Sequence, residues 1–281
     1  MKRVAVVGAS GYTGRELLRL LARHPQIAAT EVMTARPDTA PEPPAFPHEP
    51  TIAPLDVRRF AAVDGVFLCT PHGAAAPLVR AALAAGARVV DLSADFRLRD
   101  PDVYQRTYKL AHPAADLLPQ AVYGLTEHDR STIQGARLVA NPGCYPTSIL
   151  LPLLPLLAAG LLADGAPIVA DSKSGTSGAG KQPSERTHFG NVHENFLAYG
   201  VGTHRHVPEI HQQAGTDRIV FTPHLLPTFR GILTTLYLTP AAGVDAAAVR
   251  SCLAERYAGE PFVRAYAQGL PELRCVQTSN E

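Results

Sequence analysis

Cys144 lies in the segment ANPGCYPTS (140–148), between a turn-forming sequence and an apolar run. Pro146 has the fixed φ that suits the first position of a helix, so we predict a helix from Pro146 to about Gly160. A thiol beside the positive end of that helix has a lowered pKa, and its thiolate can attack an acyl carbon and hold the product as a thioester. A buried structural cysteine is the alternative. We interpret Cys144 as a nucleophile.

Titratable side chains cluster in the segment GTHRHVPEI (202–210), which contains His204, Arg205, His206 and Glu209. An imidazole oriented by a carboxylate is the usual partner of a thiolate and the usual proton donor to a carbonyl oxygen. Arg205 is a candidate for binding a substrate carboxylate or phosphate. A metal site that includes His211 is the alternative, but the spacing matches no standard zinc pattern, so we predict no metal.

Two glycine-rich loops follow predicted strands. The segment GASGYTG (8–14) precedes a predicted helix, where glycines allow close approach of a pyrophosphate and the helix N-terminus offers N–H groups. Its glycine spacing differs from the commoner dinucleotide motif, so a tight turn without a ligand is the alternative. The segment SKSGTSGAGK (172–181) has the glycines and hydroxyls to surround a phosphate, or it is a flexible surface connection; it lacks the P-loop spacing.

The end of the second predicted strand bears on the choice of dinucleotide. An NAD site usually has an acidic residue at this place, whereas this strand ends in MTARPD (33–38), with Thr34 and Arg36 before any carboxylate. A hydroxyl and a guanidinium suit a 2′-phosphate, so we predict NADP as the cofactor. A solvated Arg36 in a proline-rich loop is the alternative.

The elements that must position these residues alternate through the first half of the chain. Strand patterns cover 3–7, 30–34, 65–70, 87–93 and 136–144, helical patterns cover 15–24 and 74–86, and an irregular, proline-rich surface segment covers 37–54. This alternation predicts an α/β fold with a Rossmann-type, doubly wound parallel sheet. Strands at 166–174, 217–227 and 231–240 and a helix at 245–259 predict an α+β second domain. We place the domains at 1–145 and 146–281.

Composition excludes several classes of function. The chain has 281 residues, a formal net charge of +1 and no basic block, which argues against nucleic acid as a partner. The longest apolar run (148–162) contains Pro152 and Pro155 and is too short to span a membrane, and the N-terminus is interpreted as a strand, not a signal peptide. Cys69, Cys252 and Cys275 show no paired spacing, so we interpret them as core thiols of a cytoplasmic protein.

Together these segments resemble the N-acetyl-γ-glutamyl-phosphate reductases, in the aspartate-semialdehyde dehydrogenase-like branch of the glyceraldehyde-phosphate dehydrogenase fold. The matching stretches cover the whole chain and are VGASGYTGRELLRLLARHP (7–25), TPHGAA (70–75), VVDLSADFRLRD (89–100), NPGCYPTS (141–148), SGTSGAGK (174–181), HENFLAYGVGTHRHVPEI (193–210) and PHLLPTFRGILTTLY (223–237). The family's chain continues past the VQTSNE ending with a strand and a long helix, so we expect either a truncated sequence or a domain that is closed in another way.

The resemblance implies reduction of an acyl phosphate, N-acetyl-L-glutamyl 5-phosphate, by NADPH, with release of inorganic phosphate and N-acetyl-L-glutamate 5-semialdehyde, in arginine biosynthesis. It implies Cys144 as the nucleophile and His204 as the acid/base supported by Glu209, with His206 as the alternative. It also implies a homodimer or homotetramer. The residues that it implies for the cofactor or substrate are Gly8, Ser10, Gly11, Tyr12, Thr13, Gly14, Ser174, Gly175, Ser177 and Gly178, and we add Asn141, Arg97 and Arg205 as candidates for the substrate.

Three other functions remain open from the sequence. The first is the carrier-bound aminoadipyl-phosphate reductase of lysine biosynthesis, against which the Pro and Tyr flanks of NPGCYPTS argue. The second is aspartate-semialdehyde dehydrogenase, against which GTHRHVPEI argues. The third is a dinucleotide-binding regulator without turnover, for which the early end of the chain is the best argument.

Overall fold

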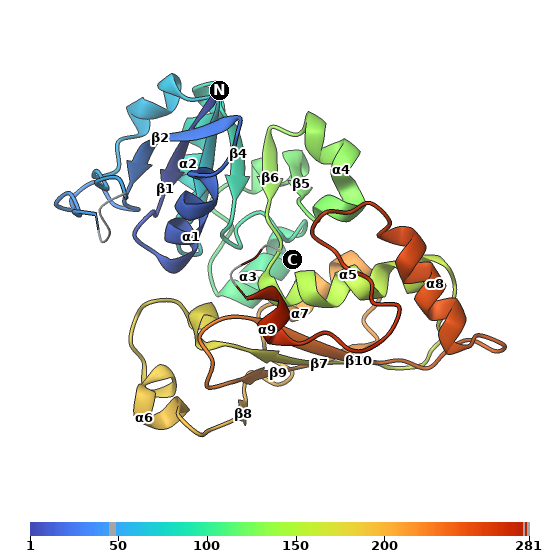
Figure 1. The fold of residues 1–281 in the computed structure, drawn as a ribbon. Coiled ribbons are helices and arrows are strands. Elements are labelled where there is room, and N and C mark those ends of the chain that lie inside the picture. The colour runs from blue at the N-terminus through green and yellow to red at the C-terminus, as the bar shows by residue number, and fades with distance from the viewer. Residues whose placement is uncertain (45–48, 278, 280–281) are drawn as a thin grey trace. The chain divides into compact units, whose positions relative to one another are not determined.

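The computed structural model describes residues 1–44, 49–277 and 279. Contacts divide the chain into two compact units, Met1–Pro142 and Gly143–Glu281, close to the division that we placed after residue 145. The first unit contains a six-stranded parallel sheet and the second a four-stranded mixed sheet (Figure 1). The predicted α/β class, with a doubly wound first domain and a different second domain, is confirmed.

The first unit has its strands in the order β2-β1-β3-β4-β6-β5. Residues Val4–Val7 of the central strand β1 are 0–5% exposed, which explains the continuous apolar run RVAVV. Its strands are β1 (Lys2–Val7), β2 (Ile27–Met33), β3 (Gly65–Leu68), β4 (Arg88–Asp91), β5 (Ala121–Tyr123) and β6 (Leu138–Ala140). Its helices are α1 (Tyr12–Leu21), α2 (Ala75–Ala84), α3 (Pro101–Tyr108) and α4 (Thr126–Gly135), with short 3-10 turns at Val57–Ala62 and Ala115–Gln120.

Several predicted boundaries in this unit are wrong. Helix α1 runs from Tyr12 to Leu21 rather than over 15–24, because Gly11 is its N-cap and the chain already turns toward β2 after Leu21. The imidazole of His24 accepts hydrogen bonds from the N–H groups of Gln26 and Ile27, so this residue belongs to the turn. The elements β5, α3 and α4 were not predicted, because short or polar elements have little apolar periodicity.

The proline-rich segment 37–54 is only partly the irregular surface excursion that we predicted. Residues 45–48 lie outside the described residues. Ile52 is 3% exposed and packs with Val4 and Val6 of β1. Ala53 pairs with Met33 as an isolated parallel bridge at the end of β2. The last residues of the segment therefore contribute to the core, which the many prolines concealed.

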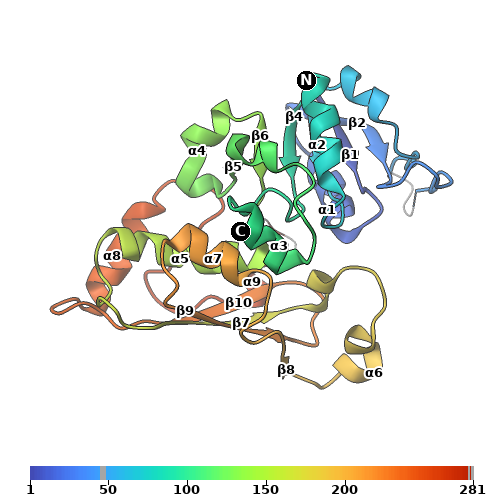
Figure 2. The same cartoon turned by 180° about the vertical axis from the view of Figure 1, so that it is seen from behind.

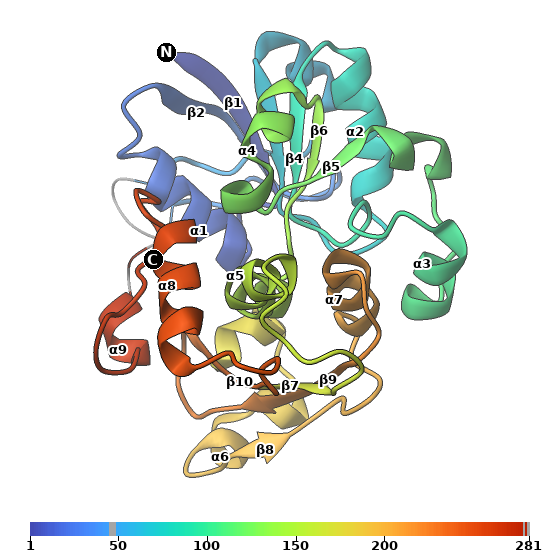
Figure 3. The same ribbon diagram turned by 90° about the vertical axis from the view of Figure 1, so that its right-hand side faces the viewer.

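The second unit has strands in the order β10-β7-β9-β8, with β7 and β9 parallel and both outer pairs antiparallel. Helices α5 and α7 pack beside each other on one face of this sheet (Figures 2 and 3). Their apolar core includes Ile149 and Leu153 of α5, Ile210 of α7 and Phe221 of β9. The strands are β7 (Ile168–Ser174), β8 (Leu197–Ala198), β9 (Ile219–Leu225) and β10 (Ile232–Tyr237). The helices are α5 (Cys144–Ala158), α6 (Phe189–Val192), α7 (Val207–Ala214), α8 (Ala246–Arg256) and α9 (Leu273–Val276), with 3-10 turns at Thr176–Ala179 and Glu185–Thr187.

The other face of this sheet carries a regular grid of side chains, here called the outer sheet face. Successive residues of a strand point to opposite faces, so the pairing of β10, β7 and β9 places one residue of each strand in every row. Several apolar members are exposed: Val220 by 52%, Leu233 by 36% and Tyr237 by 57%. The rows are Leu233, Lys173 and His224; Thr235, Asp171 and Thr222; and Tyr237, Val169 and Val220.

Candidate active site

Cys144 is the first residue of α5, and its side chain is exposed. The N-cap is Gly143, with an extended backbone (φ −66°, ψ 156°). The predicted start at Pro146 is therefore wrong by two residues. Pro146 is tolerated in the first turn because the N–H groups at a helix N-terminus have no intrahelical acceptor to lose. The thiol lies at the positive end of the helix dipole, where a negative charge is stabilised.

Glu209 contacts the backbone immediately before this thiol. It lies in the first turn of α7 and is 1% exposed, and its Oε1 accepts a 2.8 Å hydrogen bond from the N–H of Gly143. A buried carboxylate costs free energy unless it is hydrogen-bonded, and this bond joins the N-terminal ends of two packed helices. The sequence predicted only that Glu209 supports His204, so the contact with the N-cap of α5 is new.

Aromatic rings surround the half-buried imidazole of His204. Its ring centroid lies 5.4 Å from that of Tyr145, 5.6 Å from that of Tyr199 and 5.3 Å from that of Phe221. Burial, together with the positive charge of Arg205, lowers the pKa of His204 to about 4. His204 is therefore neutral at physiological pH. Arg205 itself is exposed, and its charge adds a positive field beside the imidazole pair.

His206 lies directly beside His204, with ring centroids 4.8 Å apart. The backbone N–H of His206 donates a 3.1 Å hydrogen bond to Nδ1 of His204, which assigns the proton of neutral His204 to Nε2. His206 is the N-cap of α7, and its ring centroid lies 6.0 Å from that of Tyr145. Tyr145 follows Cys144 in the chain, so its ring contacts both histidines that the sequence offered as the acid/base.

A pair of tyrosines that the sequence analysis did not single out completes this cluster. The hydroxyls of Tyr145 and Tyr199 lie 3.0 Å apart, and Tyr145 also donates to the carbonyl of His224 at 3.3 Å. Burial raises the pKa of Tyr199, and a negative charge on the Cys144 sulfur adds to that effect. Both tyrosines lie in stretches that carry the family resemblance, Tyr145 in NPGCYPTS and Tyr199 in HENFLAYGVGTHRHVPEI, and this was the signal in the sequence for the pair.

The loop after β7 is braced by the segment that precedes β10. The N–H groups of Gly175, Thr176 and Ser177 donate to the carbonyls of Gly231, Thr228 and Phe229, respectively. These three N–H groups are therefore not available to surround a phosphate, as the sequence analysis had considered. A Cβ on Gly175 would lie 2.8 Å from the carbonyl oxygen of Phe229, so only glycine fits there.

The residues of this loop that we predicted for the site differ in how exposed they are. Ser174 is 5% exposed and its hydroxyl donates to the carbonyl of Gly175 at 3.0 Å. Ser177 is half-buried and Gly178 is exposed, so these two lie at the accessible part of the loop.

In the first unit, the loop between β1 and α1 has the backbone expected of a dinucleotide site. Gly8 has φ +79°, and a Cβ there would lie 2.3 Å from the carbonyl oxygen of Cys69. A Cβ on Gly14 would lie 2.5 Å from the carbonyl oxygen of Gly8, so the helix packs directly on the loop. Gly11 is the N-cap of α1, where the first-turn N–H groups of Tyr12, Thr13 and Gly14 have no intrahelical acceptor. The loop and helix end therefore fit a pyrophosphate.

The remaining residues that we predicted for the cofactor site follow the ends of β1 and β2 in the chain. Ser10 is half-buried, and Tyr12 and Thr13 are exposed on the first turn of α1. Thr34 is 3% exposed, and its hydroxyl donates to the carbonyl of Arg36 at 2.7 Å, so Thr34 braces the loop rather than offering its hydroxyl to a ligand. Arg36 is exposed. Of these two residues, Arg36 is the one with an accessible side chain.

Arg97 and Asn141 are part of a buried network at the ends of β4 and β6. Arg97 is 7% exposed and donates to the carbonyls of Asn141 (2.8 Å) and Leu92 (2.9 Å), so in this structure it braces the chain that leads toward Cys144. Asn141 is half-buried and donates to the carbonyl of Pro142 at 3.1 Å. Both were proposed from the sequence as substrate residues, and this assignment stays a prediction.

Two buried carboxylates in the segment VVDLSADFRLRD were missed by the sequence analysis. Asp95 accepts hydrogen bonds from the N–H groups of Gly73 (2.7 Å) and Ala75 (3.0 Å) and from the hydroxyl of Tyr104 (2.9 Å). It thereby fixes the loop before α2. Asp91 is fully buried, and burial raises its pKa to about 7 although Ser93 donates to it twice. The signal in the sequence was that two acidic residues, Asp91 and Asp95, follow the apolar residues of β4.

The other cysteines differ from the prediction that all three are core. Cys69 is half-buried beside the core of β1, and burial raises its pKa to about 12. Cys252 is half-buried in α8, with its thiol 3.6 Å from the carbonyl of Pro155. Cys275 is exposed in the short helix α9, so the prediction that it is a core thiol is wrong.

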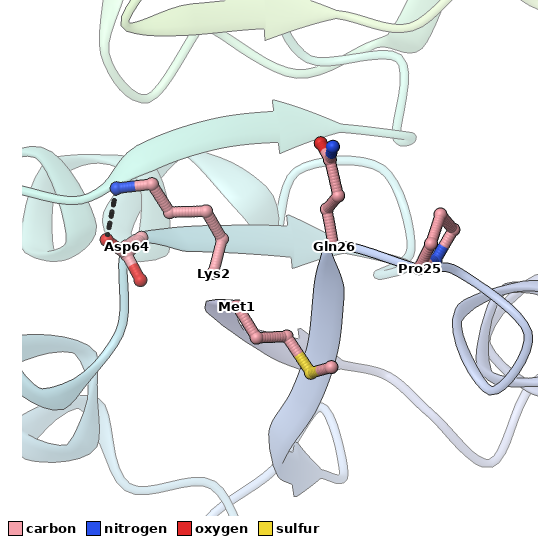
Figure 4. Close-up of a pocket in the computed structure, with 5 residues that line it drawn as sticks. All are labelled: Met1, Lys2, Pro25, Gln26 and Asp64. Atoms are coloured by element: carbon pink, nitrogen blue, oxygen red, sulfur yellow. Dashed lines mark hydrogen bonds and ion pairs between the residues drawn. The ribbon is translucent and has the colours of Figure 1, made fainter.

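A surface depression in the first unit lies at the amino ends of the strands, opposite to the carboxyl ends where the Gly8 loop lies. It is lined by Met1, Lys2, Pro25, Gln26 and Asp64, at the start of β1 and β2 (Figure 4). Lys2 and Asp64 form an exposed ion pair across it, with 3.0 Å between Nζ and Oδ1. Because parallel sheets bind ligands at the carboxyl ends of their strands, this depression is not the cofactor site.

Within residues 1–44, 49–277 and 279, no three His, Cys, Asp or Glu side chains are grouped so that they could hold a metal ion. Over the same ranges, no helix is both long enough and apolar enough to cross a membrane.

Comparison with family models matches both units of the chain. Residues 3–136 match the model described as semialdehyde dehydrogenase, NAD binding domain. Residues 144–281 match the model described as semialdehyde dehydrogenase, dimerisation domain. The candidate cofactor loop thus lies in the first match and the thiol, histidines and Glu209 in the second.

Curated relatives and solved structures agree with these matches. The chain is 47% identical to the N-acetyl-gamma-glutamyl-phosphate reductase of Magnetococcus marinus over 290 residues, which is 99% of this chain and 83% of the relative. It is 47% identical to that of Rhodospirillum rubrum, with the same shares covered. Aspartate semialdehyde dehydrogenase II of Vibrio cholerae has a TM-score of 0.64 at 18% identity, covering 90% of this chain and 78% of that one. The Candida albicans enzyme, crystallised with NADP, has a TM-score of 0.60 at 14% identity, covering 91% and 76%. These low identities bear on the fold alone.

Proposed function

Because the chain belongs to the semialdehyde dehydrogenase family, we propose that it reduces N-acetyl-L-glutamyl 5-phosphate to N-acetyl-L-glutamate 5-semialdehyde and phosphate, as a cytoplasmic enzyme of arginine biosynthesis. The observation that carries the proposal is the exposed thiol of Cys144 at the first position of α5, in the same unit as the histidine pair. The names of its 47% identical relatives support the choice of substrate.

The first chemical step is an acyl transfer to sulfur. The Cys144 thiolate attacks the carbonyl carbon of the acyl phosphate, the carbon–oxygen bond to phosphate breaks, and inorganic phosphate leaves with that electron pair. The product is a thioester. The N-terminus of α5 favours the thiolate before attack and keeps the acyl group at a fixed place afterwards.

The second step consumes the reduced cofactor. NADPH, when bound, supplies a hydride to the thioester carbon. The resulting hemithioacetal oxygen is negatively charged until it is protonated or until the carbon–sulfur bond breaks and releases the aldehyde. A proton donor near Cys144 would stabilise that oxygen before the carbon–sulfur bond breaks and returns the electron pair to sulfur, and the two candidates are the imidazoles beside Tyr145.

Of the two imidazoles, His206 is our choice as the proton donor. His204 has a pKa of about 4 because it is buried among aromatic rings, so little of it is an imidazolium at physiological pH. Its Nδ1 is also occupied by the N–H of His206. In this proposal His204 orients the start of α7, and His206 exchanges the proton.

NADP is the proposed dinucleotide. The glycine loop at Gly8 to Gly14 fits the pyrophosphate, and Arg36 is the exposed cation at the end of β2. The family match supports a nicotinamide dinucleotide in general, and a structural neighbour was crystallised with NADP.

A homodimer is the proposed assembly, formed through the outer sheet face. Its exposed apolar residues Val220, Leu233 and Tyr237 lie around the Lys173–Asp171 ion pair (2.6 Å), a pattern that suits a self-complementary contact. The match of residues 144–281 to a dimerisation domain supports this partner. Val220→Lys should shift the molecular mass measured by light scattering from dimer to monomer. Val57→Lys, at a 42% exposed valine of the first unit, is the matched control, and a dimeric Val220→Lys variant would contradict the assignment.

The reaction is tested by running it backwards. N-acetylglutamate semialdehyde, phosphate and NADP should give phosphate-dependent formation of NADPH, and the aspartyl analogue should be turned over at least 100-fold less efficiently. Cys144→Ser should abolish turnover while the affinity for NADPH, measured by fluorescence, changes less than twofold. Preference for aspartate semialdehyde would move the chain to the other branch of the family, and absence of turnover would favour a regulator.

A further inference from the structure

Glu209 connects the helix of the histidine pair to the helix of the thiol. It is the third residue of α7, its side chain is almost completely buried, and its partner is the N–H of Gly143, 66 residues away in the sequence. Gly143 has no side chain with which to cap α5, and Cys144 is the next residue. The carboxylate therefore bonds to the backbone one residue before the nucleophile.

We propose that Glu209 is a positioning residue for the Cys144 thiol, which it holds through the N–H of Gly143. The proposal rests on the proposed function, because it assumes that Cys144 is the nucleophile. Glu209 need not touch substrate or cofactor in this role.

The geometry explains why the backbone at this point needs an external anchor. A glycine N-cap leaves the entry to α5 with the conformational freedom of glycine, and its own N–H precedes the helical hydrogen-bond ladder. A rotation about the Gly143 backbone would move the Cβ of Cys144 and swing the sulfur. Reaction rates fall steeply when a nucleophile is misplaced by about 1 Å. One charged hydrogen bond at 2.8 Å restrains that rotation.

The choice of glutamate, rather than a neutral acceptor, has an electrostatic reason. A buried carboxylate is favoured at the N-terminal ends of helices, and Glu209 lies in the first turn of α7 while bonding the N-cap of α5. The same negative charge is bonded to the backbone one residue before Cys144, so it opposes formation of a second negative charge on the thiol. Glu209 therefore holds the thiol in place at the expense of some of its reactivity.

Two substitutions distinguish the restraint by the hydrogen bond from the repulsion by the negative charge. Glu209→Gln keeps a carbonyl oxygen that can accept from Gly143 but removes the charge. Glu209→Ala removes both the acceptor and the charge. We expect alkylation of Cys144 by iodoacetamide at pH 7 to become at least about threefold faster in both variants. We expect kcat to fall about 100-fold in Glu209→Ala, with KM changed less than threefold, and to stay within about threefold of wild type in Glu209→Gln.

The measurements are made on the full chain with Cys275→Ser, since Cys275 is the other exposed thiol among the described residues. Glu255→Gln, an exposed glutamate in α8, is the matched control and should change none of these values. Thermal unfolding is recorded for each variant. If Glu209→Ala does not fold, Glu209→Asp replaces it, because the shorter side chain withdraws the acceptor but keeps the charge; it should lose kcat without faster alkylation.

Two results would overturn the positioning role. One is a kcat for Glu209→Ala, or for Glu209→Asp, within threefold of wild type. The other is an equal loss of kcat in Glu209→Gln and Glu209→Ala, which would show that the charge and not the hydrogen bond matters. The alkylation rates do not need turnover, so a wild-type chain inactive toward N-acetylglutamyl phosphate would refute the proposed reaction and still report whether Glu209 acts on the thiol.

Discussion

The N–H of His206 donates a 3.1 Å hydrogen bond to Nδ1 of His204. The backbone of His206 thereby fixes the tautomer of the His204 imidazole. The same bond restrains the start of α7, because His206 is the N-cap of that helix. The two histidines are therefore not equivalent, although the sequence presents them symmetrically around Arg205. One is a neutral acceptor within an aromatic cage, and the other begins the helix that carries Glu209.

The two histidines should respond differently to substitution. Asparagine can replace Nδ1 of His204 with an amide oxygen, so His204→Asn keeps the bond to His206 and should lower kcat by less than about tenfold. His206→Asn removes the proposed proton donor and should lower kcat by about 10²- to 10⁴-fold. Steady-state rates in the direction of semialdehyde oxidation measure both. A larger loss in His204→Asn than in His206→Asn would reverse the assignment.

The buried carboxyl of Asp91 should make the fold less stable as the pH rises. Its pKa is raised to about 7 by burial, above the unfolded value near 4, so the folded state retains a proton that the unfolded state has lost. This carboxyl therefore costs no stability below about pH 4, and its cost grows between about pH 4 and pH 7 to the order of 4 kcal/mol. The free energy of unfolding in urea, measured from pH 4 to pH 8, should show this decline.

Asp91→Asn should flatten that decline, since the amide does not ionise, while it keeps an acceptor for Ser93. The difference in unfolding free energy between the variant and wild type should change in favour of the variant by about 1 kcal/mol per pH unit across this window. Asp102→Asn, at an exposed aspartate of α3, is the control and should leave the pH slope unchanged. A wild-type slope that persists in Asp91→Asn would mean that another group titrates.

The sequence was sufficient for features that depend on local pattern. The apolar run of β1, the glycines at Gly8 and Gly14 and the turn before Cys144 each follow from backbone requirements that neighbouring residues satisfy. A backbone position with a positive φ, or one with no space for a Cβ atom, requires glycine. Such positions can therefore be recognised in the sequence without a structure. The family resemblance is confirmed for the same reason, since it rests on such segments.

The sequence was insufficient for features that depend on long-range contacts. The bond between Glu209 and Gly143 joins residues 66 apart, and nothing near Glu209 in the sequence indicates that its partner is a backbone N–H. The exposure of Cys275 is similar, because the sequence around it does not show that the short helix α9 has no buried residue. Arg97 was proposed from its charge, and nothing in the sequence indicates that it donates to the carbonyls of Asn141 and Leu92.

Gly14 should be intolerant of even a methyl group. A Cβ there would lie 2.5 Å from the carbonyl oxygen of Gly8 and 2.6 Å from Cα of Ala9, and backbone atoms cannot move aside without displacing the loop. Gly14→Ala should therefore lower stability by about 1–3 kcal/mol and weaken NADPH binding at least tenfold. Thermal unfolding and fluorescence titration measure the two effects.

The control for that substitution is Gly135→Ala at the end of α4. Among the described residues, nothing lies within 4 Å of a Cβ built there, and alanine favours helices over glycine. This variant should be as stable as wild type or slightly more so, with unchanged NADPH affinity. If Gly14→Ala behaves in the same way, the close approach of α1 to its loop is not required for the cofactor site.

Arg36 should determine the preference for NADPH over NADH. It is the exposed guanidinium after β2, where the 2′-phosphate of NADPH needs a cation, while Thr34 is already bonded within the loop. Arg36→Glu should lower kcat/KM for NADPH by about 10- to 100-fold, since it replaces an attractive charge with a repulsive one, and change kcat/KM for NADH less than threefold. Arg23→Glu makes the same change of charge at an exposed residue after α1 and should affect neither cofactor. An equal loss for NADPH and NADH in Arg36→Glu would show that Arg36 supports the loop and does not select the phosphate.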